Sequence, residues 1–115
     1  MNHKDLDVWK KSVDLVLKIY NITKQFPKEE MFGLVNKMRR AAVSIPSNIA
    51  EGCARFSDKD TLRFIDIAFG SVAELETQLI IAEQLGYCKS CEIMSDIDKV
   101  EKLLSGLRRH LKNKN

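Results

Sequence analysis

The sequence predicts a single-domain, all-α protein that folds as an antiparallel up-and-down four-helix bundle over residues 1–115. The chain contains only 5 Gly and 2 Pro, too few turn residues for the many short strands of a sandwich or barrel. Apolar residues recur at alternating spacings of three and four in four separate segments, which is typical of helices with one buried face. Short connections join these segments, so we expect consecutive helices to pack as antiparallel neighbours.

The first two helices are expected at about residues 5–25 and 29–52. Pro27 separates them, because proline disfavours the helical conformation for the residue before it. Pro46 lies inside the second pattern and lacks the N–H that would bond to the Ala42 carbonyl, so we expect a kink there. The expected core positions are Leu6, Trp9, Val13, Val16, Tyr20 and Thr23 in the first helix, and Met31, Val35, Met38, Ala42, Ile45 and Ile49 in the second.

The third and fourth helices are expected at about residues 58–86 and 90–111. Ser57 is a good N-cap, followed by two Asp residues in the first turn, where the helix dipole favours negative charge. Gly86 is a suitable stop. The expected core positions are Ile65, Ala68, Val72, Leu75, Leu79 and Ala82 in the third helix, and Ile93, Ile97, Val100, Leu104, Leu107 and Leu111 in the fourth.

Composition limits the class of protein. The net charge of +3 and pI of about 8.8 are mildly basic, weaker than the charge of a dedicated nucleic-acid domain. No apolar run approaches the roughly 18–20 residues of a membrane-spanning helix, and the first five residues lack the apolar segment of a signal peptide. We therefore expect a cytoplasmic protein without a membrane partner, whose three cysteines are reduced thiols.

Apolar residues outside the expected core positions form a second stripe on the first helix. At 100° per residue this stripe lies roughly a third of a turn from the first. A helix that is apolar beyond one stripe is either central in its fold or covered by a partner, and a wide monomer core is the alternative here. We expect a homo-oligomer whose subunit interface includes Leu15, Ile19, Ile22, Phe26 and Phe32.

Residues 6–87 resemble the four-helix-bundle family of proteins encoded in intervening sequences of bacterial 23S ribosomal RNA genes. The most specific stretch runs from Met38 to Gly52 and reads MRRAAVSIPSNIAEG, with shorter matches at residues 5–10, 26–34, 68–76 and 85–87. The resemblance implies an antiparallel bundle that assembles into a ring of five. A relative in diversity-generating retroelements looks like a basic pentameric barrel that binds nucleic acid and a reverse transcriptase. RNA, DNA or a partner protein is thus an implied partner.

Basic side chains are the candidate nucleic-acid-binding residues, because Arg and Lys can hold phosphate oxygens. One polar face of the second helix combines such bases with Ser44, Ser47, Asn48 and Glu51. Structural pairing with acids is the equally open alternative for this face, and ordinary solvated charge is the alternative near the second loop. The expected nucleic-acid-binding residues are Lys37, Arg39, Arg40, Arg55, Lys59 and Arg63. Six further bases lie towards the end of the fourth helix, where positive charge complements the negative end of the helix dipole. We therefore expect these bases to have a structural role.

Other candidate sites carry less weight. Cys88 and Cys91 form a CxxC pair, but only Cys53, His3 and His110 remain as further soft ligands, short of a zinc set. Asn48 and Glu51 have no His or Cys at helical spacing to act as base or nucleophile. We expect no cofactor, no metal and no catalysis. The expected function is that of a homo-oligomeric nucleic-acid-binding protein; the alternative is a protein-interaction scaffold or accessory subunit without nucleic acid.

Overall fold

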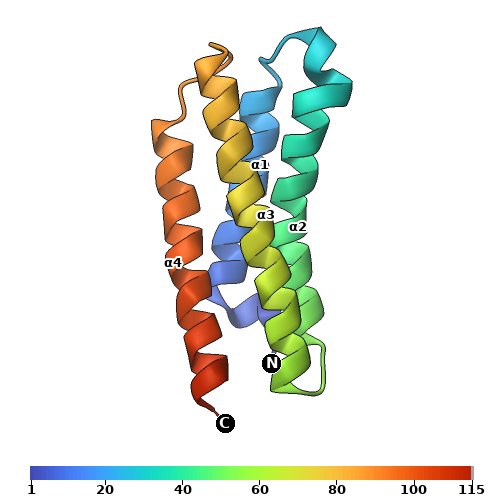
Figure 1. The fold of residues 1–115 in the computed structure, drawn as a ribbon, viewed down its shortest axis with the longest axis vertical. Helices are drawn as coiled ribbons and strands as arrows, with labels where there is room; N and C mark the ends of the chain where they lie inside the picture. Colours follow the sequence, from blue (N-terminus) through green and yellow to red (C-terminus); the bar gives the residue numbers. More distant parts are fainter. Residues whose placement is uncertain (115) are drawn as a thin grey trace.

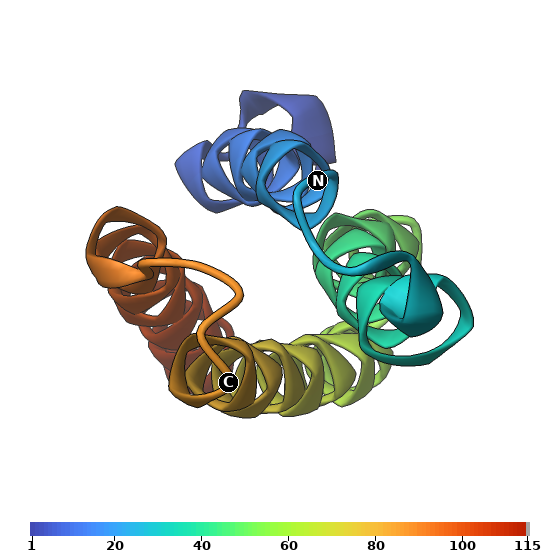
Figure 2. The same ribbon diagram turned by 90° about the horizontal axis from the view of Figure 1, so that it is seen from above.

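The computed structural model describes residues 1–114 and contains four α-helices: α1 (Asp7–Thr23), α2 (Asn36–Cys53), α3 (Asp58–Gln84) and α4 (Cys91–Asn113). They alternate in direction along a bundle about 47 Å long (Figure 1). Seen from above, each helix occupies one corner (Figure 2). The part of the chain that is described has no β-strand, and none of its helices is both long and apolar enough to span a membrane. The predicted all-α, four-helix class is thus confirmed.

Local chemistry accounts for both ends of α3. The Ser57 side chain accepts a hydrogen bond from the Asp60 backbone N–H at 3.1 Å, so it caps α3 as expected. At the other end of α3, Gly86 has a φ of 82°, a left-handed conformation that glycine adopts without steric cost. The Tyr87 N–H then bonds back to the Ala82 carbonyl. Ser57 and Gly86 therefore define where α3 begins and ends.

The second expected helix is divided. A short 3-10 helix (Lys28–Glu30) and a π-helical turn (Met31–Val35) precede α2. The backbone leaves helical geometry at Gly33, with φ −110° and ψ −109°, and the Glu30 carboxylate accepts a hydrogen bond from the Leu34 N–H. By contrast, α2 continues as one helix through the buried Pro46. The interruption therefore lies at a glycine near the start of the segment.

The predicted core positions are correct in α3 and almost all correct in α2 and α4. All six in α3 are buried, whereas Met31 before α2 is exposed and Leu107 in α4 is half-buried. In α1 the prediction was only partly correct. Thr23 is buried, and Leu6, Trp9 and Val16 are half-buried against the core, whereas Tyr20 is exposed. The most buried face of α1 consists of Val8, Ser12, Leu15, Ile19 and Thr23.

This result corrects the predicted subunit interface. Leu15 is 1% and Ile19 0% exposed within a single chain, and Phe26 is also buried. Ile22 is half-buried and packs against the same core. Leu15, Ile19 and Phe26 therefore have almost no surface left for a second subunit. Ile22 keeps part of its surface, and Phe32, which is 93% exposed, is the most available of the five residues expected at the interface.

The helices α2 and α3 approach closely at Gly52. The Thr61 hydroxyl donates a hydrogen bond of 2.8 Å to the Gly52 carbonyl. A Cβ added at position 52 would lie 3.1 Å from both the Thr61 carbonyl oxygen and the Phe64 Cβ. Both atoms belong to or adjoin the α3 backbone, so neither can move without shifting the helix.

Gly52→Ala is therefore expected to destabilise the protein, even though alanine favours helix by about 1 kcal/mol. Forcing extra volume into a packed contact costs about 1–3 kcal/mol. Gly70→Ala is the matched control, because nothing lies within 4 Å of a Cβ added there, and it should stabilise. Thermal unfolding by circular dichroism measures both. If the two substitutions shift Tm in the same direction, the close approach at Gly52 does not constrain the packing.

Candidate nucleic-acid interface

Basic side chains from segments far apart in the sequence meet at one end of the bundle. The loop after α2 and the start of α3 lie there, beside the C-terminal end of α4 (Figure 1). Two ion pairs connect these segments: Arg108 to Asp66 at 2.7 Å and Lys114 to Asp58 at 3.7 Å. We call this surface the basic end; it comprises Arg55, Lys59, Arg63, Arg108, Arg109, Lys112 and Lys114.

Two of the predicted arginines are arranged around one aromatic ring. The guanidinium carbon of Arg55 lies 4.7 Å from the Phe64 ring centroid, and that of Arg63 lies 4.8 Å from it. Arg55 also pairs with Glu51. Cation–π contacts hold both guanidinium planes against the protein while leaving N–H donors towards solvent. Lys59, in the first turn of α3, is exposed.

The other three predicted residues lie elsewhere. Arg39 Nε donates to the Thr23 hydroxyl at 2.9 Å and its Nη2 to the Tyr20 carbonyl at 3.3 Å, with the guanidinium 4.6 Å from the Tyr20 ring centroid. Arg39 thus joins α2 to α1. Lys37 and Arg40 are exposed but lie fifteen or more residues before Arg55, roughly 20 Å along the helix axis. The six predicted residues therefore do not form one surface.

The hydroxyl and amide groups of the predicted polar face serve helix packing. The Ser44 and Ser71 hydroxyls are 2.8 Å apart and join α2 to α3. The Asn48 amide donates to the Ser44 carbonyl at 2.8 Å and to its hydroxyl at 2.9 Å. These groups are engaged within the bundle, which favours the structural interpretation of this face over phosphate binding.

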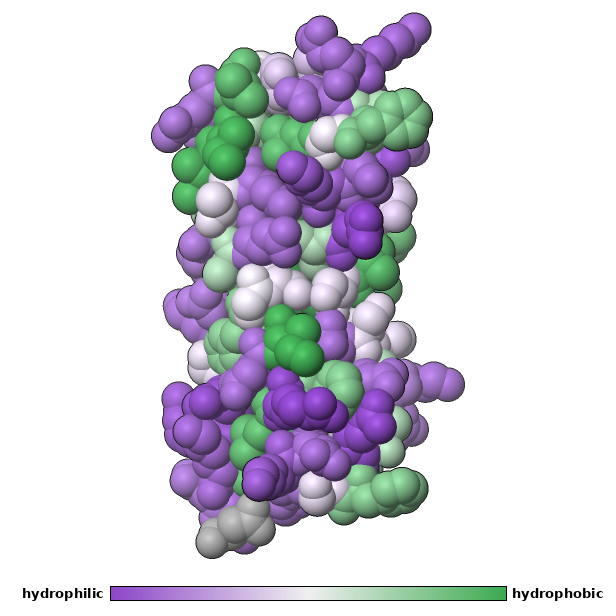
Figure 3. All heavy atoms as spheres, turned by 45° about the vertical axis from the view of Figure 1, so that its right-hand side comes forward, coloured by the Kyte–Doolittle hydropathy of each residue, from purple (hydrophilic) through white to green (hydrophobic). Residues whose placement is uncertain are grey.

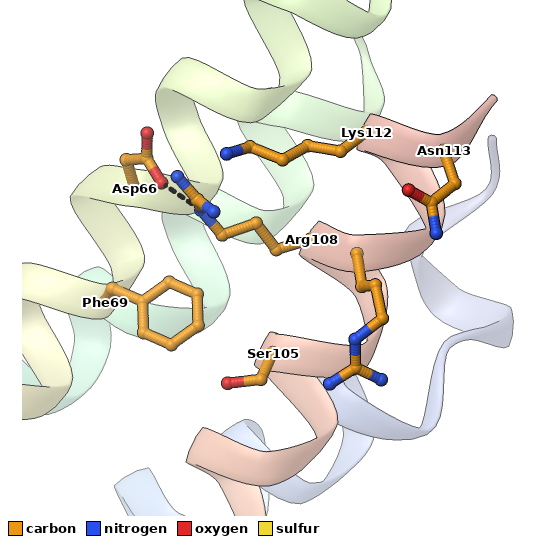
Figure 4. Close-up of a pocket in the computed structure, with 7 residues that line it drawn as sticks. Asp66, Phe69, Ser105, Arg108, Lys112 and Asn113 are labelled. Carbon is orange, nitrogen blue, oxygen red and sulfur yellow. Dashed lines mark hydrogen bonds and ion pairs between the residues drawn. The ribbon is translucent and has the colours of Figure 1, made fainter. Parts of the chain in front are cut away.

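A pocket between α3 and α4 lies at the basic end and has a volume of about 470 Å³. Arg108 and Lys112 extend from α4 towards α3, and Phe69 supplies an aromatic wall (Figure 4). Positions 105, 108, 109 and 112 share one helix face, so the sequence alone could have grouped them, but their proximity to Phe69 needed the fold. This α3–α4 pocket is lined by Asp66, Phe69, Ser105, Arg108, Arg109, Lys112 and Asn113.

A groove lined by both polar and apolar side chains, here the α2–α3 groove, lies towards the opposite end of the bundle. Its volume is about 840 Å³, and exposed Phe32 and Ile81 line it with Lys37, Arg40 and Glu74. Apolar side chains gather at that end of this face (Figure 3). The Gln78 side chain, only 8% exposed, also lines the groove, and its Oε1 has no hydrogen-bond partner within the described chain. An unsatisfied buried acceptor of this kind costs roughly 1–3 kcal/mol.

The cysteines do not lie in a common site. Cys53 is buried and Cys91 exposed, and burial raises the pKa of the Cys88 thiol. Among residues 1–114, no three His, Cys, Asp or Glu side chains lie close enough together to hold a metal ion. A raised pKa keeps Cys88 in its less nucleophilic thiol form.

Comparisons with known proteins agree with this fold. Residues 4–108 match the family model described as 23S rRNA-intervening sequence protein. A solved structure from Bacteroides thetaiotaomicron VPI-5482, described as a protein of unknown function from the S23 ribosomal protein family, is 25% identical and has a TM-score of 0.80. The match covers 95% of this chain and 99% of that chain. No curated protein sequence matches significantly. Since the family model spans nearly the whole bundle, the chain belongs to the 23S rRNA-intervening sequence protein family.

Proposed function

We propose that this chain is a non-enzymatic, homo-oligomeric protein that binds the phosphate backbone of RNA or DNA through its basic end. The observation that carries the proposal is the convergence of bases from the α2–α3 loop and the C-terminal end of α4. On α4, residues 105–114 contain Arg108, Arg109, Lys112 and Lys114 and no Asp or Glu. Arg108 forms an ion pair with Asp66, and Lys114 forms one with Asp58. Within residues 1–114, no ion pair is formed by four other bases of the basic end, Lys59, Arg63, Arg109 and Lys112.

Binding of this kind depends on charge. Each phosphate that a Lys or Arg neutralises releases condensed counterions, so affinity falls as the salt concentration rises. Contacts to phosphates fix the position of the nucleic acid but do not distinguish its bases. The name of the family points to an RNA-related role, which supports RNA as the first ligand to test. Cytoplasmic location remains part of this proposal.

The α2–α3 groove with the exposed Phe32 is the proposed subunit interface. The Phe32 side chain is 93% exposed in the single chain. A second copy that covered this ring would remove its apolar surface from water. Assembly into a ring, five-fold by resemblance, would repeat the basic end in every subunit. Weak phosphate contacts would then add through avidity.

Phe32→Glu is expected to convert the oligomer into smaller species without unfolding the bundle, because the side chain is 93% exposed in the single chain. Light scattering coupled to size exclusion measures the mass. The matched control is Phe56→Glu, an equally apolar and exposed position at the basic end. If wild type is already a monomer at micromolar concentration, or if both variants assemble like wild type, the groove is not the interface.

A protein-interaction scaffold is the second candidate, because the same groove could receive a different protein. A gel shift with structured RNA and with duplex DNA, each at two salt concentrations, separates the two functions. A salt-sensitive shift supports the proposal. If neither nucleic acid shifts at low salt, the scaffold function replaces it.

A further inference from the structure

We propose that the α3–α4 pocket takes one unpaired nucleotide of a single strand, with the base against Phe69 and the phosphate held by Arg109 or Lys112, the cations that form no ion pair. This inference rests on the proposed function and makes it more specific, since the basic end as a whole would accept any polyanion. The pocket combines an aromatic wall with cations from one helix face. Phosphate alone would need only the cations.

Phe69 is held in place for stacking. It packs against the hydrophobic core on one side and lines the pocket on the other (Figure 4). A half-buried ring loses little conformational freedom when a base stacks on it, and base–aromatic stacking contributes roughly 1–3 kcal/mol per base. In a duplex both faces of each base are already stacked on neighbours. An unpaired nucleotide is therefore the form that can use this wall.

The charges of the pocket divide into a fixed pair and free cations. Arg108 Nε donates to the Asp66 carboxylate at 2.7 Å, which largely neutralises that guanidinium. Arg109 and Lys112 are exposed and form no ion pair within the described residues, so they are the groups left for a phosphate. Arg provides a planar fork of donors and Lys a mobile point charge, a combination suited to phosphate oxygens.

The size and the remaining polar groups also fit a nucleotide. The volume of about 470 Å³ lies within the roughly 300–1,000 Å³ of small-molecule sites. The Ser105 hydroxyl and the Asn113 amide line the pocket with donors and acceptors that could meet the sugar or a base edge. Neither group is placed as a fork for one particular base, so we expect tolerance of base identity.

The test compares normal and abasic single strands of equal length by fluorescence anisotropy. Phe69→Leu should weaken binding of the normal strand by about five-fold or more and leave the abasic strand unchanged, because only the base uses the ring. Phe69→Tyr is the matched control, since it keeps the aromatic face and should bind like wild type. Circular dichroism checks that each variant is folded. A 2-aminopurine base in the strand should lose fluorescence on binding to wild type but not to Phe69→Leu.

The outcomes separate this inference from the proposed function. If Phe69→Leu binds both strands like wild type, the pocket does not receive a base, although phosphate binding at the basic end stands. If Phe69→Leu weakens the abasic strand equally, the ring acts only through packing and the inference fails. Titration with a free nucleoside monophosphate, followed by NMR, shows whether the pocket takes the nucleotide alone or needs a strand. If wild type binds neither strand nor monophosphate, this inference is wrong, and the gel shift with structured RNA and duplex DNA decides the proposed function separately.

Discussion

Replacing Leu15 and Ile19 together with Glu is expected to unfold the protein. The two side chains are 1% and 0% exposed in the single chain, so each carboxylate would enter the apolar core without a partner. Burying an unpaired charge costs several kcal/mol, and two such charges match or exceed the roughly 5–15 kcal/mol stability of a typical domain. Circular dichroism should show that the helical signal is lost.

Leu17→Glu with Asn21→Glu is the matched control. These two positions have the same spacing on the same helix and are exposed, so helicity should remain. If the Leu15 and Ile19 double variant keeps its helicity and loses only its assembly, these residues face a partner subunit, and the packing of α1 described above is wrong.

Reversing one charge from each segment of the basic end, with Lys59→Glu and Arg109→Glu, is expected to weaken nucleic-acid binding by about ten-fold or more. Hydrogen bonds to charged groups contribute roughly 1.5–3 kcal/mol each, and the upper part of that range does not apply to exposed groups. The fold should tolerate the first change, because an acid in the first turn of α3 suits the helix dipole. Anisotropy with a labelled strand measures the loss.

The control for this variant is Lys24→Glu with Lys28→Glu at the other end of the bundle. Each reversal removes two units of charge, so both double variants move the net charge from +3 to −1. An equal loss of affinity in both double variants would show that binding depends only on net charge. A loss confined to the control would move the binding surface to the end that carries Lys24 and Lys28.

The sequence predicted the fold because α3 and α4 each carry an unbroken apolar stripe. In α1 a polar residue misled the prediction. Ser12 sits in the middle of the buried face and is satisfied by donating to the Trp9 carbonyl at 2.8 Å. Period counting therefore preferred the neighbouring stripe through Tyr20, an exposed residue whose ring lies against Arg39. A side chain with an apolar body and a polar tip, such as Tyr20, can lie on the buried or on the exposed face of a helix.

The candidate site was predicted only in part. The grouping of Arg55, Lys59 and Arg63 follows from their position after the second helix, but Arg39 could not be separated from Arg40 by charge alone. One guanidinium is held by α1, and the other is exposed. The α2–α3 loop lies beside the end of α4 because the four helices pack antiparallel. Residue spacing within one helix cannot predict this proximity.

The most direct test of the central claim is the affinity of the wild-type protein for a labelled RNA strand across a series of salt concentrations. Phosphate binding predicts a straight line of log affinity against log salt, with a slope near −0.7 for each phosphate contacted on a single strand. Lys59, Arg63, Arg109 and Lys112 together predict a slope of roughly −3 per subunit engaged. A flat line, or no binding at the lowest salt concentration, would contradict the account.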